Sequence, residues 1–77
     1  MATYRRGAKG PEVKRIQTRL RELGRYAGSI DGDFGGGTES AVVGFERAAG
    51  LSPDGIVGAE TWAALFPSEA MPAPALL

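Results

Sequence analysis

The side chains best suited to ligand chemistry follow the first helical pattern of the chain. Arg25 supplies a cation, Tyr26 supplies an aromatic ring, and Asp31 and Asp33 supply carboxylates. A guanidinium pairs with carboxylates, an aromatic ring packs on apolar faces, and a carboxylate accepts hydrogen bonds from hydroxyl and amine groups. Arg47 is a further candidate, provided that helix packing brings it to the same groove. This combination favours binding over bond cleavage.

The composition excludes most catalytic mechanisms. The 77 residues include no Cys and no His, so the thiol nucleophile, the commonest general base and the usual zinc ligands are all missing. A glycosidase built on Asp31, Asp33 and Asp54 would need a substrate cleft for which so short a chain has little room. An EF-hand calcium loop needs further ligands after Asp33, where the sequence continues Phe34-Gly35. We therefore expect no catalytic residue, no metal and no cofactor.

The carboxylates belong to an internal repeat. The segment from Asp31 to Val42 aligns without a gap with the segment from Asp54 to Leu65, and both read D-G-x-apolar-G-x-x-T. The aspartate can accept backbone N–H groups of a tight turn, and the glycine after it takes the dihedral that other residues avoid. The apolar residue can anchor the loop in the core, and the threonine falls in the first turn of a helix. The repeat thus predicts two loop–helix units, in which the alternative role of each aspartate is to hold its turn.

Three helices are predicted from apolar periodicity and stop signals. The first begins at Pro11 and ends at Gly24, and the second begins near 37–38 and ends at Gly50. The third runs from about Ala59 to Phe66, before Pro67. The expected inward residues are Val13, Ile16, Gln17, Leu20 and Leu23 in the first helix, Ala41, Val42, Phe45 and Ala48 or Ala49 in the second, and Trp62, Leu65 and Phe66 in the third.

These elements indicate an all-α fold, a compact three-helix bundle built with two repeated Asp-Gly loop–helix units. Residues 1–6 form an N-terminal arm, residues 7–67 the domain and residues 68–77 a flexible tail or linker. A very short strand contact between Ile30 and Ile56 is compatible with the pattern, and Leu76 and Leu77 offer an apolar end that could dock on a partner.

Charge is distributed unevenly along a chain of net charge zero. Residues 1–25 carry eight Lys and Arg against two Glu, and the remainder carries one Arg against seven acids. The basic first helix could face an anionic polymer, or it could simply be a solvated surface. Nucleic acid is disfavoured because aromatic residues are not interleaved with the cations. No apolar run is long enough for a membrane span, and the N-terminal residues do not read as a secretory signal.

The motifs occur in the order and at the spacing of a known family. Gly10, Glu12-Val13-Lys14-Arg15-Ile16-Gln17, Leu20 and Leu23-Gly24 are followed by Ile30-Asp31-Gly32, Phe34-Gly35, Thr38, Ala41-Val42 and Phe45, and then by Gly50-Leu51, Asp54-Gly55-Ile56-Val57-Gly58, Thr61-Trp62 and Leu65. Over residues 7–66 the chain resembles the peptidoglycan-binding domains of bacterial and phage wall hydrolases. The resemblance implies a three-helix bundle without metal or cofactor that targets attached activities to peptidoglycan. The chain departs from the family at Glu46, where glutamine is common, and at Gly44 within the second helix.

The resemblance gives the candidate residues a ligand. Tyr26 could stack on a sugar or a peptide stem, Arg25 could pair with a stem carboxylate, and Asp33 could accept hydrogens from sugar or amine groups. The alternative is that Tyr26 only covers the end of the first helix.

Two functions follow. The first is non-catalytic binding of peptidoglycan that anchors an enzyme or assembly on the wall, with a wall-associated, periplasmic, extracellular or virion location. The alternative is a small docking subunit of a phage or of a secretion or injection assembly, in which the same fold contacts a protein partner.

Overall fold

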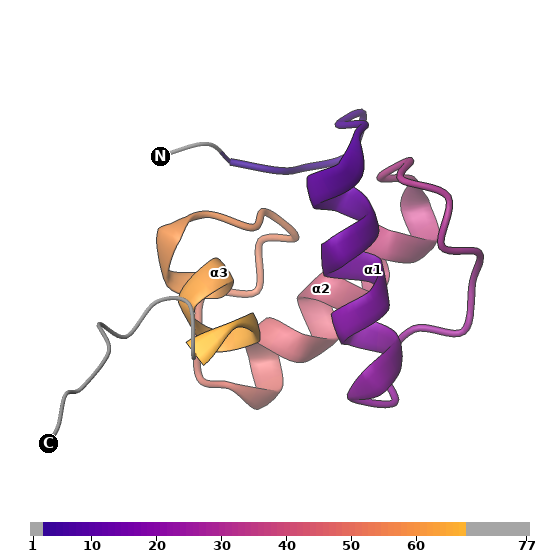
Figure 1. The fold of residues 1–77 in the computed structure, drawn as a ribbon. Coiled ribbons are helices and arrows are strands. Elements are labelled where there is room, and N and C mark those ends of the chain that lie inside the picture. Colours follow the sequence, from indigo (N-terminus) through magenta and orange to yellow (C-terminus); the bar gives the residue numbers. More distant parts are fainter. Residues whose placement is uncertain (1–2, 68–77) are drawn as a thin grey trace, which may run out of the picture.

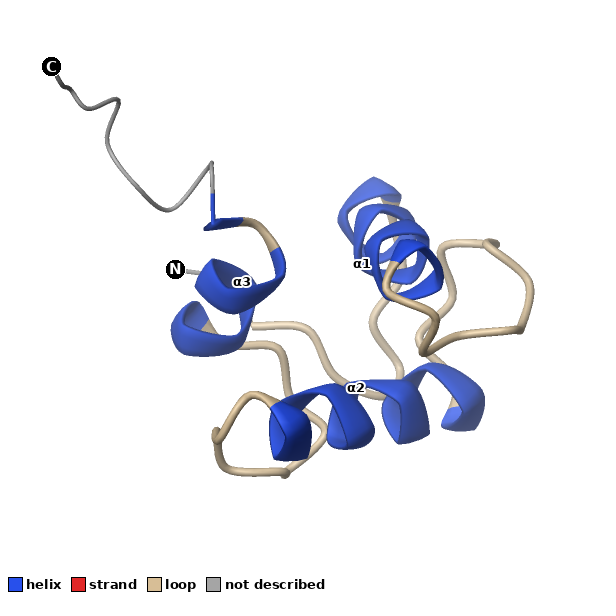
Figure 2. Ribbon diagram, turned by 90° about the horizontal axis from the view of Figure 1, so that it is seen from below, coloured by secondary structure: helices blue, strands red, loops and turns tan. Residues whose placement is uncertain are grey.

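The computed structural model describes residues 3–67, which form three helices. They are α1 (Pro11–Glu22), α2 (Gly36–Ala48) and α3 (Ala59–Leu65), so the predicted all-α bundle is confirmed. Figures 1 and 2 show α2 lying across the molecule, with α1 over one end and α3 over the other. None of these helices is long and apolar enough to cross a membrane, within the part of the chain that the structure describes.

Helices α1 and α2 begin and end where the local signals predict. Pro11 is the first residue of α1, and Gly24 and Gly50 follow α1 and α2 with φ values of 75° and 76°. After α1, the N–H of Arg25 donates to the carbonyl of Leu20 at 2.8 Å, and after α2 the N–H of Leu51 donates to that of Glu46 at 2.8 Å. This pattern is a Schellman motif, which satisfies the last carbonyls of a helix and needs a residue in the left-handed region.

A single apolar core joins the helices and the loops. Val13, Ile16 and Leu20 of α1 are fully buried. The turns contribute Phe34 and Val57, which are 1% and 0% exposed, as the sequence predicts for the apolar residue of each turn. The remaining core residues are Ala41, Val42 and Phe45 of α2 and Leu65 of α3.

Several residues expected inside lie outside or only partly inside. Leu23 is 39% exposed because α1 ends at Glu22 and the chain turns away at Gly24. Ala48 and Ala49 are exposed because α2 ends there, beyond the core, and Trp62 and Phe66 are half-buried.

Pairing of the loops also differs from expectation. Ile30 and Ile56 do not pair, and the bridges within residues 3–67 are Tyr4 with Val57 and Lys9 with Asp33. Tyr4 and Val57 exchange two backbone hydrogen bonds of 3.0 and 2.7 Å. The described part of the N-terminal arm therefore pairs with Val57, the residue after Ile56, where the sequence had suggested a contact between Ile30 and Ile56.

Candidate functional site

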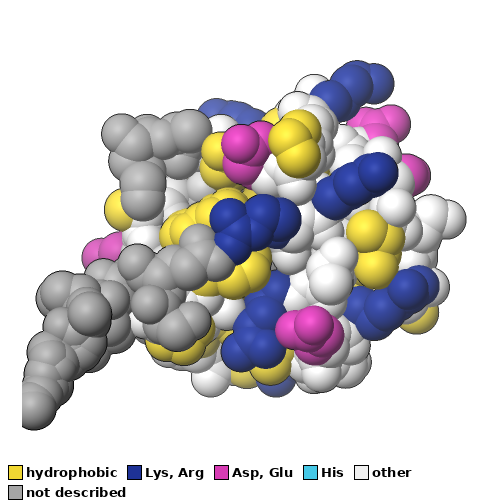
Figure 3. Space-filling model, viewed as in Figure 1, with side chains coloured by type: hydrophobic (Ala, Val, Ile, Leu, Met, Phe, Trp, Pro, Cys, Tyr) yellow, Lys and Arg dark blue, Asp and Glu magenta, His cyan; other side chains and the backbone are white. Residues whose placement is uncertain are grey.

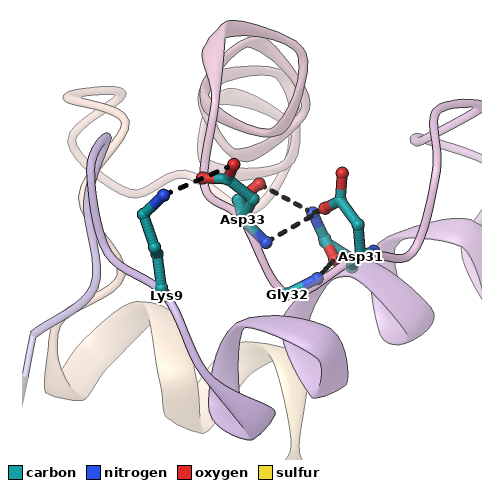
Figure 4. Close-up of polar contacts among 5 residues, drawn as sticks. Lys9, Asp31, Gly32 and Asp33 are labelled. Atoms are coloured by element: carbon teal, nitrogen blue, oxygen red, sulfur yellow. Dashed lines mark hydrogen bonds and ion pairs between the residues drawn. The ribbon is translucent and has the colours of Figure 1, made fainter.

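The first Asp-Gly turn is organised by the side chain of Gln17, which is buried on the inner face of α1. Its Oε1 accepts the N–H groups of Asp31 and Gly32 at 3.0 and 2.9 Å. Its Nε2 lies 3.1 Å from the Oδ1 of Asp31, the carbonyl of Asp33 and the Oγ1 of Thr38, and shares its two hydrogens among them. One amide thus fixes the turn against the start of α2, and Figure 4 shows the turn.

Asp31 lies at this turn with its carboxylate already engaged. Its Oδ1 accepts the N–H of Asp33 at 3.0 Å as well as the Gln17 amide. The Asp33 N–H, and then Gln17, stabilise the ionised form and lower the pKa of Asp31 below its ordinary value. Holding the turn is therefore a role that the geometry supplies for Asp31 without any ligand.

Asp33 points to the opposite side of the turn, toward the segment before α1 (Figure 4). Its Oδ2 lies 3.8 Å from the Nζ of Lys9, and both side chains are exposed. These groups line a hollow of about 510 Å³ together with Gly10, Pro11, Lys14, Asp31 and Gly32. The hollow presents two cations and two carboxylates, so it can bind a ligand that carries both positive and negative charges.

Tyr26 and Arg25 lie at a second hollow, of about 340 Å³, between the loop and α2. The hydroxyl of Tyr26 donates to the carbonyl of Ser29 at 2.6 Å, and its ring packs so closely on Gly28 that a Cβ there would come within 2.8 Å of it. Tyr26 is thus half-buried and shapes the loop, whereas Arg25 is exposed. The remaining lining residues are Ala27, Gly28, Gly37, Ser40 and Ala41.

The structure does not bring all the predicted site residues together. Asp31 and Asp33 share one hollow, and Arg25 and Tyr26 share another. The Nε2 of Gln17 links the two, since it also lies 3.4 Å from the Tyr26 hydroxyl. Arg47 is exposed on α2 and lines neither hollow.

A second buried polar side chain, Glu46, holds the other Asp-Gly turn. It is 1% exposed, its Oε1 accepts the N–H of Gly55 at 2.9 Å, and its Oε2 accepts the hydroxyl of Thr61 at 2.8 Å. Burial raises the pKa of Glu46, and the nearby Asp54 acts in the same direction. Our sequence analysis missed this role, although Glu46 follows the buried Val42 by one helical turn.

The chain is similar to known proteins that carry this kind of domain. A family model described as "Putative peptidoglycan binding domain" matches residues 9–65. The N-acetylmuramoyl-L-alanine amidase CwlM of Mycobacterium tuberculosis is 40% identical over 76 residues, which cover 84% of this chain and 19% of that protein. The spore cortex-lytic enzyme of Bacillus cereus is 46% identical over 56 residues, covering 73% of this chain and 22% of that enzyme.

Among solved structures, the SleB N-terminal domain superposes with a TM-score of 0.84 at 40% identity, covering 87% of this chain and 92% of that one. The chain therefore spans about a fifth of the length of the two curated relatives, but most of a solved N-terminal domain.

Proposed function

Because the chain belongs to the family of peptidoglycan-binding domains, we propose that it binds bacterial peptidoglycan without cleaving it and holds an associated enzyme or assembly on the wall. Membership of such a family implies an association with the cell wall. The observation that carries the proposal is the match over residues 9–65, which takes in all three helices and both Asp-Gly turns. The module corresponds to only a small part of the hydrolases it resembles, which fits targeting rather than cleavage.

The hollow beside Arg25 is our candidate for the peptidoglycan contact. A peptide stem carries carboxylates, and the exposed guanidinium of Arg25 can pair with one of them through two N–H groups. The edge of the Tyr26 ring and the small residues Gly37 and Ala41 leave room for a sugar or a methyl group beside that pair. Asp33, at the neighbouring hollow, can accept hydrogens from an amine of the same stem.

The test is co-sedimentation of the purified chain with intact sacculi. We expect Arg25→Ala to weaken binding by about tenfold, the order expected for the loss of one exposed guanidinium–carboxylate pair. Arg47→Ala is the matched control, because it removes the same charge from an exposed position outside the hollow. Circular dichroism checks that both variants keep the helical fold.

Two outcomes of this experiment would contradict the proposal or move the site. Failure of the unmodified chain to sediment with walls of several bacterial types at low salt would show that the module does not bind peptidoglycan. Equal losses in Arg25→Ala and Arg47→Ala would move the site away from the hollow beside Tyr26.

A further inference from the structure

A groove runs between α1 and α3, and it shares Lys14 with the hollow beside Asp33. It has a volume of about 490 Å³, and its α1 wall carries Lys14, Arg15 and Arg19, with one acid, Glu22. Its opposite wall is apolar and consists of Leu65, the last residue of α3, and of Phe66 and Pro67 after it. We call it the basic groove. Figure 3 shows several Lys and Arg side chains spread over this face of the molecule.

Two of the three cations are held in place by the opposite wall. The guanidinium of Arg15 lies over the rings of Trp62 and Phe66, 5.3 and 4.9 Å from their centroids. The Nε of Arg19 donates to the carbonyl of Leu65 at 2.7 Å, and its Nη1 contacts Glu22 at 3.2 Å. Because these contacts already restrict the side chains, a ligand that binds them loses less conformational entropy.

The electrostatics of the whole chain favour an anion at this face. Residues 1–25, which include all of α1, carry eight cationic side chains and two acids, whereas the rest of the chain carries one cation and seven acids. This excess of positive charge attracts a polyanion to α1. Glu39 and Asp33 of the acidic part pair with Arg6 and Lys9, at 3.6 and 3.8 Å, and these cations do not line the groove.

We propose that the basic groove binds an anionic wall polymer with a polyol-phosphate backbone, in addition to any peptidoglycan contact elsewhere on the module. The groove is open along α1, and Arg15 and Arg19 are one helical turn apart, about 6 Å along the axis. A flexible chain with repeated phosphates can therefore contact more than one cation. Glu22, at the end of the cationic row, opposes this binding.

The aromatic residues argue for polyol phosphate over single-stranded nucleic acid. Binding of nucleic acid strands relies on open aromatic faces on which bases stack. Here Arg15 lies over Trp62 and Phe66, and Tyr4 packs beside Trp62 with ring centroids 5.8 Å apart. The groove thus offers cations and an apolar wall, which suit a polymer without bases.

The experiment measures binding of the full chain to purified poly(glycerol phosphate) by fluorescence anisotropy. We expect binding at low salt that weakens as salt screens the charges. Arg15→Gln should reduce affinity roughly two- to fivefold, the range that one exposed charge pair supports. Glu22→Gln should raise it by a similar factor, and this gain cannot result from misfolding. Arg47→Gln, which makes the same charge change on α2, should leave affinity within about twofold of the unmodified chain.

Three outcomes would overturn the proposal. They are an absence of binding at low salt, equal effects of Arg15→Gln and Arg47→Gln, and equally tight binding of a single-stranded DNA of the same length in phosphates. Sedimentation with sacculi stripped of phosphate polymers tests the proposed peptidoglycan binding separately from polymer binding. Arg15→Gln should sediment normally with stripped sacculi, whereas a chain that fails on stripped sacculi but binds the polymer contradicts only the peptidoglycan proposal.

Discussion

At the scale of single residues, the two Asp-Gly turns are held by side chains of different chemistry. The amide of Gln17 offers both a donor and an acceptor, so it satisfies backbone N–H groups with its oxygen and Thr38 with its nitrogen. The carboxylate of Glu46 accepts from Gly55 and Thr61, and its burial disfavours the charge. A glutamine at position 46 could make both contacts, with the Thr61 hydroxyl turned to accept.

We therefore expect Glu46→Gln to stabilise the domain at neutral pH by about 1 kcal/mol, because the variant keeps both contacts and removes a charge whose burial is unfavourable. The folded-state pKa of Glu46 is raised above its ordinary value of 4.5, so the folded chain holds this proton more tightly than the unfolded chain. The stability of the unmodified chain should then fall as pH rises from about 4.5 through the raised pKa, and the advantage of the variant should appear over the same range. Thermal unfolding at about pH 4 and pH 7 measures both the loss of stability of the unmodified chain and the advantage of the variant.

Glu60→Gln is the matched control, since Glu60 is an exposed acid in the first turn of α3. A stability difference between Glu46→Gln and the unmodified chain that stays constant with pH would contradict the assignment.

At the scale of elements, local signals predicted the helices, and distant contacts escaped prediction. Pro11, Gly24 and Gly50 act on their immediate neighbours, so the sequence contains enough information to locate the bounds they set. The pairing of Tyr4 with Val57 joins segments far apart in the chain and has no local signal. The inward residues of α1 and α2 were predicted correctly in the middle of each helix, but Leu23, which follows the last turn of α1, was not.

This difference between mid-helix and helix end can be measured in α1. Leu20→Ala should cost roughly 2 to 5 kcal/mol, because Leu20 is 0% exposed and truncation leaves a cavity. Leu23→Ala removes the same atoms from a residue that is 39% exposed and should cost well under half as much. Urea unfolding compares the two variants, and equal costs would contradict the packing of α1.

At the scale of the whole molecule, neither the spread of the candidate site nor the position of the basic groove could be predicted. Sequence proximity suggested one site for Arg25, Tyr26, Asp31 and Asp33, but Tyr26 and Asp31 line different hollows, although both lie near the Nε2 of Gln17. Arg47 joins neither side, because helix packing sets its position. The charge separation was visible in the sequence, but the groove also needs α3 against α1.

The pairing of the N-terminal arm has a consequence for the connectivity of the domain. Tyr4 packs on Trp62, whose ring centroid lies 4.5 Å from that of Phe66, so the segments around Tyr4 and Phe66 lie on the same flank. Because these two segments share one flank, a glycine-rich linker could join residue 67 to residue 3. A circular permutant opened between the exposed Ser52 and Pro53 should keep the helical circular dichroism spectrum and a cooperative thermal transition. Loss of that transition would mean that the order of the segments matters as well as their contacts.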